Sequence, residues 1–125
     1  MTYDEFRKEF FVVFRRAMSF SEKARREGLL ALEEEFDPEK ANNRDIFEYG
    51  MCLTVDGTDA ELINKILSNI INQEKDGYAK TLKQIQKEGV LSIQAGDNPR
   101  ISVFLMNSYT DISLGDCYKA LEWEE

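Results

Sequence analysis

The helical spacing of its apolar residues is the feature that most constrains what this chain can fold into. The clearest instance follows Thr58–Glu61, which has the form of a capping box. Behind it, apolar side chains recur in pairs every four residues. They are Leu62, Ile63, Ile66, Leu67, Ile70 and Ile71. We therefore predict a helix over Asp59–Lys75 and, since the other apolar segments follow the same spacing, an all-α bundle of four to six helices.

A second apolar pattern begins directly after Asp76-Gly77 and predicts a helix over Tyr78–Ala95. Gly77 can adopt the left-handed conformation that ends a helix, so the two helices form the central antiparallel hairpin of the predicted bundle. The hairpin would bury Leu62, Ile66 and Ile70 against Leu82 and Ile85. One uninterrupted helix over Asp59–Ala95 is the alternative, because one glycine costs a helix only about 1 kcal/mol.

The stretch Phe20–Phe36 predicts another amphipathic helix, preceded by an N-cap in Ser19–Ser21. Most of its charged residues lie opposite the apolar half, but Arg25 points into that half. Glu33 follows two turns later, about 12 Å along the axis. An arginine at such a place must extend its charged end to water, pair internally, or contact something outside the chain.

Start and stop signals mark the remaining helices. The predicted first helix begins at a capping box, Thr2–Glu5, and carries four phenylalanines within the first fourteen residues. Another predicted helix begins at Asp45 and ends at Asp56-Gly57. Gly96 ends the second helix of the hairpin, and Asn98-Pro99 begins a short one. Residues 111–125 are either an added helix or a loose end.

Composition narrows the function classes. The net charge of −8 argues against nucleic acid and against an anionic membrane surface as partners, and favours a basic patch on another protein. The chain has no histidine, no phosphate-binding loop and no dinucleotide fingerprint, so we expect neither an enzyme nor a cofactor. Asp56–Glu61 lacks the spacing of a calcium loop. Cys52 and Cys117 stand alone, which predicts reduced thiols in a cytoplasmic protein, and no apolar run is long enough to insert into a membrane.

Three segments resemble the MotA family, the ion-channel subunit of the bacterial flagellar stator within the MotA/TolQ/ExbB superfamily. ARREGLLALEEE and GMCLTVDGTDAELINKIL are similar to the cytoplasmic loop between the family's second and third membrane helices. EGVLSIQAGDNPR is similar to its cytoplasmic tail after the fourth membrane helix. The resemblance implies that residues 1–75 correspond to the loop and 76–110 to the tail of one cytoplasmic domain, 1–125, without the intervening membrane helices. It leaves residues 111–125 unassigned.

The resemblance also implies a function. In the family an arginine and a glutamate of this loop engage opposite charges on the rotor switch protein, and the matching positions are Arg25 and Glu33. With the neighbouring Glu22 and Arg26 they form the predicted partner-binding site. The implied partners are a flagellar rotor switch protein (FliG-type) and full-length stator subunits at the inner membrane. Without membrane helices the chain would not conduct ions. The chain is either a natural, shortened relative of the family or two stator segments joined together. The alternative function is a soluble helical adaptor or regulator that keeps the stator-like fold.

Overall fold

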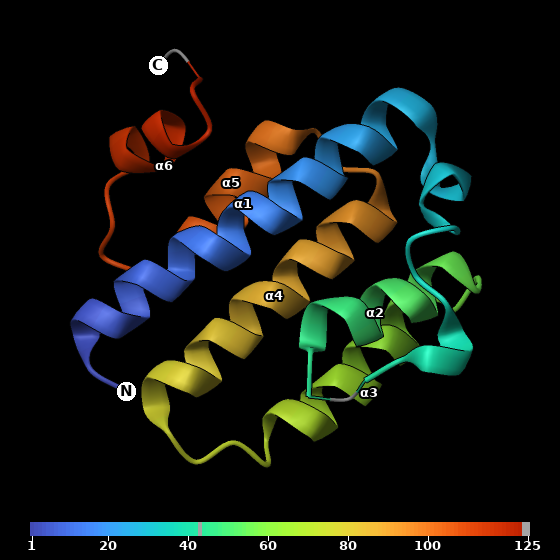
Figure 1. Ribbon diagram of the computed structural model, residues 1–125, viewed down its shortest axis with the longest axis horizontal. Coiled ribbons are helices and arrows are strands. Elements are labelled where there is room, and N and C mark those ends of the chain that lie inside the picture. The colour runs from blue at the N-terminus through green and yellow to red at the C-terminus, as the bar shows by residue number, and fades with distance from the viewer. Residues whose placement is uncertain (43, 124–125) are drawn as a thin grey trace.

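The computed structural model describes residues 1–42 and 44–123, and every regular element within these ranges is a helix (Figure 1). The fold is therefore all-α, as predicted. In chain order the elements are α1 (Tyr3–Glu27), the 3₁₀ turns η1 (Leu29–Leu32) and η2 (Pro38–Lys40), α2 (Ile46–Val55), α3 (Ala60–Ile71), α4 (Gly77–Ala95), α5 (Pro99–Asn107) and α6 (Leu114–Ala120). In these ranges no helix combines the length and the apolar character needed to cross a membrane.

Helix α4 is the centre of the bundle and contacts α1, α2, α3 and α5. In Figure 1 it runs diagonally through the molecule, with α1 and α5 on one side and α2 and α3 on the other. Small residues let two neighbours come close to it: Gly89 of α4 faces Ala17 of α1, and Gly50 of α2 faces Val90 of α4. Because a glycine leaves room for a neighbouring helix, α4 packs against α1 and α2 at two consecutive residues.

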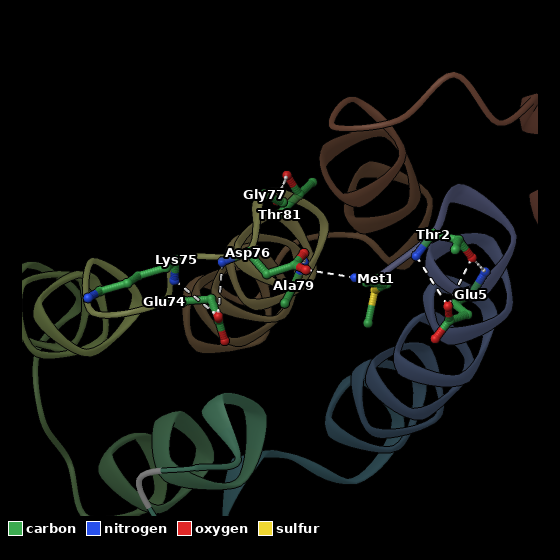
Figure 2. Close-up of polar contacts among 9 residues, drawn as sticks. All are labelled: Met1, Thr2, Glu5, Glu74, Lys75, Asp76, Gly77, Ala79 and Thr81. Atoms are coloured by element: carbon green, nitrogen blue, oxygen red, sulfur yellow. Dashed lines mark hydrogen bonds and ion pairs between the residues drawn. The ribbon is translucent and has the colours of Figure 1, made fainter.

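Helices α3 and α4 form the predicted antiparallel hairpin, so the alternative of one uninterrupted helix is wrong. The carboxylate of Glu74 accepts hydrogen bonds from the N–H groups of Lys75 and Asp76, and the carboxylate of Asp76 accepts one from the N–H of Ala79 (Figure 2). Asp76 is thus the N-cap of α4. The predicted left-handed Gly77 is wrong, because Gly77 is the first residue of α4 and its φ is not positive.

The buried stripe of α3 lies one residue away from the predicted one. Ile63, Leu67 and Ile71 are buried, whereas Leu62 is 45% exposed and Ile66 is half-buried. Both stripes have the same helical spacing, so periodicity could not choose between them; packing against α2 and α4 did. The helix also ends four residues before the predicted end at position 75, where the turn into α4 begins.

Capping side chains begin the other helices at or next to the predicted places. Asn98 caps α5 with Pro99 as its first residue, as predicted, and Asp45, the predicted start of α2, is the N-cap of that helix. For α3 the predicted cap was one residue too early. Asp59, not Thr58, is the N-cap, and its carboxylate accepts a hydrogen bond from the N–H of Leu62 at 2.9 Å.

Helix α1 begins as predicted, runs through the predicted break and ends before the predicted end of the second helix. Its capping box, Thr2 with Glu5, is confirmed. No break occurs at Ser19–Ser21; Ser21 is buried inside the continuous helix. The predicted helix over Phe20–Phe36 is helical only as far as Glu27 and wrong beyond it. The C-cap of α1 is Gly28, which has φ 89° and ψ 162°, a region that essentially only glycine occupies.

The residues after Gly28 turn back onto the bundle. Leu32 of η1 is buried, and Phe36 is buried against Phe20 and Phe47, with ring centroids 4.9 and 6.1 Å away. A helix continued past Gly28 would carry both side chains away from this cluster. The apolar area gained by folding back is therefore the physical reason for the early end of α1.

Of the two alternatives given for residues 111–125, the structure shows the added helix, α6. Ser113 caps α6, and Asp116 of α6 pairs with Arg7 of α1 at 2.9 Å. The guanidinium of Arg100 on α5 lies 5.3 and 5.6 Å from the ring centroids of Tyr118 and Trp123. These contacts fix α6 and the residues just beyond it against α1 and α5.

Helices α1 and α4 run parallel, which gives the bundle two distinct ends. At one end the amino group of Met1 lies 2.7 Å from the carboxylate of Asp76, at the start of both helices (Figure 2). At the other end Nη1 of Arg25 donates a hydrogen bond to the carbonyl of Gly96 at 3.3 Å, at the termination of both helices. We refer to these as the Met1–Asp76 end and the Arg25–Gly96 end.

Candidate functional site

The four residues predicted to bind a partner all lie near the Arg25–Gly96 end, but not on one helix. Glu22, Arg25 and Arg26 occupy the last two turns of α1. Glu33 follows η1, and its backbone N–H donates to the carbonyl of Leu30. The predicted placement of Glu33 two turns along the same helix as Arg25 is wrong, because α1 ends between them.

Arg25 has a structural contact that explains its position. Its guanidinium caps the carbonyl of Gly96, the residue after α4. Because α1 and α4 are parallel, the negative ends of both helix dipoles meet here, and a cation between them is favourable. Of the three possibilities for Arg25, internal contact is the one that the geometry provides, while its side chain remains exposed to solvent.

The other three predicted residues have different surroundings. Arg26 and Glu33 are exposed, and their side chains form no hydrogen bond or ion pair with any residue in the described ranges. Glu22 borders an open groove of about 480 Å³ with Asn98 at the start of α5 and Trp123. The structure therefore places Glu22 beside the start of α5 and Arg25 against the end of α4, and leaves Arg26 and Glu33 exposed to solvent.

A small cavity under Arg25 was not predicted from sequence. It has a volume of about 150 Å³ and lies between the ends of α1 and α4. Its lining residues are Ser21, Ala24, Arg25, Leu29, Ile93, Gly96 and Asp97.

The buried hydroxyl groups of Ser92 and Ser102 orient the carboxylate of Asp97, the acidic residue that lines this cavity. Ser92 Oγ donates to a carboxylate oxygen of Asp97 at 2.9 Å and lies 2.6 Å from Ser102 Oγ. Since the Ser92 proton is used for Asp97, Ser102 donates to Ser92. Nothing in the sequence marks these two serines as buried or paired, because serine is common on helix surfaces. They meet only because α5 packs on α4.

The chemistry available in this region is that of charge contacts. Among residues 1–42 and 44–123 there is no group of three or more histidine, cysteine, aspartate or glutamate side chains that could hold a metal ion. Cys52 and Cys117 are buried and unpaired, and burial raises the pKa of both thiols. A thiol with a raised pKa is a poor nucleophile, because the thiolate is the reactive form.

A second charged surface lies between α1 and α6. Arg7 and Arg15 of α1, Lys119 of α6 and the Phe11 ring border an open groove of about 270 Å³. The spacing of Arg7, Phe11 and Arg15 at i, i+4 and i+8 is a signal in the sequence that could have placed them on one stripe of a helix. Sequence reasoning missed the groove because α6, which supplies its other wall, had not been assigned.

Fold and candidate site together describe a small all-helical protein that carries exposed charged side chains near the Arg25–Gly96 end. The comparisons add no closer assignment: no protein-family model, no curated protein and no solved structure matches this chain.

Proposed function

We propose that this chain is the rotor-facing cytoplasmic part of a flagellar stator (MotA-like) protein and makes electrostatic contacts with a rotor switch protein (FliG-type). The proposal rests on the resemblance of three segments to the MotA family, and one feature of the bundle supports it. The places at which membrane helices would join the chain lie together at one end. In a full stator subunit this end would face the inner membrane from the cytoplasm, next to the other stator subunits.

The supporting feature is that the three positions at which membrane helices would join the chain lie close together at the Met1–Asp76 end. In the family the second membrane helix leads into the first segment, the third leaves after the second, and the fourth returns before the tail. The matching positions are the start of α1, the end of α3 and the start of α4. The amino group of Met1 lies 2.7 Å from Asp76, and α3 ends only five residues before this aspartate.

The charges predicted to meet the rotor lie at the opposite end. Helix α1 has 25 residues, so its length separates the two ends by about 36 Å at 1.5 Å per residue. One end could then adjoin the membrane while the other is free to contact a partner. Within that site Arg26 and Glu33 are the fully exposed residues that have no side-chain contact to lose within residues 1–42 and 44–123, whereas Arg25 would have to exchange its bond to Gly96.

Binding of the purified chain to a purified FliG-type rotor switch protein tests this proposal. We expect charge reversal at the exposed residues, Arg26→Glu or Glu33→Lys, to weaken binding several-fold at low salt, because charge contacts at an interface govern encounter and orientation. Raising the salt concentration should reduce the difference. A charge reversal on the rotor protein that restores binding would identify the facing residue.

Lys75→Glu provides the matched control. Lys75 is exposed at the Met1–Asp76 end and its substitution changes the net charge by the same amount as Arg26→Glu. It should leave rotor binding unchanged. If the chain does not bind the rotor protein, or if Lys75→Glu weakens binding as much as Arg26→Glu, the rotor contact is contradicted. Either result would favour the alternative, a soluble helical adaptor that keeps a stator-like fold.

A further inference from the structure

We infer that the groove between α1 and α6 is a docking site for an acidic, partly apolar peptide segment of another protein. We call it the α1–α6 groove, and its lining residues are Arg7, Phe11, Arg15, Asp116, Lys119 and Ala120. This inference does not depend on the rotor contact, because it concerns the first half of α1 together with α6 and a different set of residues.

The charge of the α1–α6 groove is opposite to that of the whole chain. Three cationic side chains and one carboxylate line it, although the chain carries 24 acidic and 16 basic residues. Asp116 is already paired with Arg7 at 2.9 Å. Neither Arg15 nor Lys119 forms an ion pair with any residue in the described ranges, and both side chains are exposed. The groove therefore presents two uncompensated positive charges on an otherwise acidic molecule.

The groove is held in shape by contacts that a docking segment would not need to break. The Arg7 guanidinium lies 5.3 Å from the centroid of the Phe11 ring while it also bonds to Asp116. The adjoining Tyr3 hydroxyl donates to Asp111 at 2.7 Å, which ties the chain before α6 to α1. Phe11 and Ala120 supply an apolar surface between the cations. Because Arg7 and Phe11 are already held by these contacts, they lose little side-chain entropy when the groove is occupied.

These features select the class of ligand. Cations at the rim of an open groove bind a single small anion weakly, since exposed ion pairs contribute little. Several carboxylates on one peptide can meet Arg15 and Lys119 together, while an aliphatic side chain of the peptide covers Phe11 and Ala120. A nucleic acid would extend beyond the three cations onto the acidic remainder of the surface and be repelled there. The occupant that fits is an acidic peptide with interspersed apolar residues.

A synthetic peptide, acetyl-(Glu-Glu-Leu)₄-amide, is the probe for the test. Trp123 is the only tryptophan, and its ring lies 6.3 Å from that of Tyr118 on α6, so its fluorescence reports on this helix. We expect saturable binding that weakens with salt. The double variant Arg15→Glu/Lys119→Glu should weaken binding about tenfold or more, as expected when two attractive contacts become repulsive.

The control is Lys65→Glu/Lys75→Glu, which reverses two exposed lysines elsewhere and produces the same net charge. It should change binding by less than about twofold. Circular dichroism establishes that both double variants are folded. Absence of saturable binding, equal weakening in the two double variants, equal binding of the peptide with Gln in place of Glu, or tighter binding of a dT12 oligonucleotide would each overturn the inference. The rotor-binding variants at Arg26 and Glu33 should not affect this peptide, so the two proposals fail separately.

Discussion

At the scale of single residues, the contact between Gly50 and Val90 controls how closely α2 can pack on α4. A Cβ added at Gly50 would lie 2.8 Å from both γ-carbons of Val90, which is itself fully buried. We predict that Gly50→Ala destabilises the protein by about 1–3 kcal/mol through overpacking, in spite of alanine's better helix propensity. Urea unfolding measures this change in the free energy of unfolding.

Gly77→Ala is the matched control for that substitution. A Cβ at Gly77 meets nothing within 4 Å, and the residue is the first of α4. This substitution should be neutral or stabilise by up to about 1 kcal/mol. Adding Val90→Ala to Gly50→Ala should recover part of the loss in a double-mutant cycle. Equal effects of the two glycine substitutions would show that the contact with Val90 does not limit packing.

Arg25 and Arg26 are neighbours in sequence with different roles. Arg25 caps Gly96 at the ends of two parallel helices, whereas the side chain of Arg26 has no hydrogen bond within the described ranges. We predict that Arg25→Ala lowers the melting temperature by about 1–4 °C, as expected for loss of a cation at helix C-termini. Arg26→Ala should change it by less than about 1 °C. Thermal denaturation followed by circular dichroism gives both values; the reverse order would refute the capping role.

At the scale of elements, Gly28 decides where α1 ends. Its φ of 89° with ψ of 162° is nearly closed to residues with a Cβ, although the space around it is open. We predict that Gly28→Ala destabilises the fold by about 1–3 kcal/mol through backbone strain. If the helix lengthened instead, Leu32 and Phe36 would leave the core and the loss would be larger. Chemical denaturation gives the loss, and the helical signal distinguishes strain from lengthening.

Capping side chains determine where most of the helices begin, and these side chains could be recognised in the sequence. Acids and amides begin α2, α4 and α5 through hydrogen bonds to the first free N–H groups, a purely local interaction. The error at Thr58 arose because two residues in a row could cap α3. The error at Gly77 arose because a glycine between two helices can either end the first or begin the second. In both cases the neighbouring aspartate took the position of the cap, Asp59 for α3 and Asp76 for α4.

At the scale of the whole molecule, the charge distribution predicts the response to pH. The Lys83 ammonium lowers the pKa of Glu74, and the Arg7 guanidinium lowers the pKa of Asp116, each through a direct hydrogen bond. A lowered pKa means that the folded state binds the proton less readily, so this stability is present above the ordinary values of 4.5 and 3.8 and is lost as pH falls through the lower folded values.

We therefore predict a melting temperature that is nearly constant between about pH 5.5 and 7 and that falls on acidification below about pH 4.5. The chain has no histidine, whose titration would otherwise lie in the upper part of this range. Differential scanning calorimetry at a series of pH values provides the measurement. A transition near pH 6.5 would contradict the prediction. Asp116→Asn should reduce the acid-induced loss, because it removes the carboxylate that pairs with Arg7.

The sequence by itself determined the class of the fold, the presence of the helical hairpin and most helix starts. These depend on apolar spacing and on side chains that bond to nearby backbone groups, which act over a few residues. It also placed the four charged residues of the predicted site in one neighbourhood. It could not choose between adjacent buried stripes of α3, because both satisfy the same period.

Tertiary structure alone decided the rest. It set the parallel arrangement of α1 and α4, which turns Arg25 into a cap for Gly96, and the return of Phe36 onto Phe20, which ends α1 early. It also joined Arg15 of α1 to Lys119 of α6 across 104 positions in one groove. Such contacts form between residues far apart in the chain, so their energies depend on how whole helices pack and leave no local pattern in the sequence.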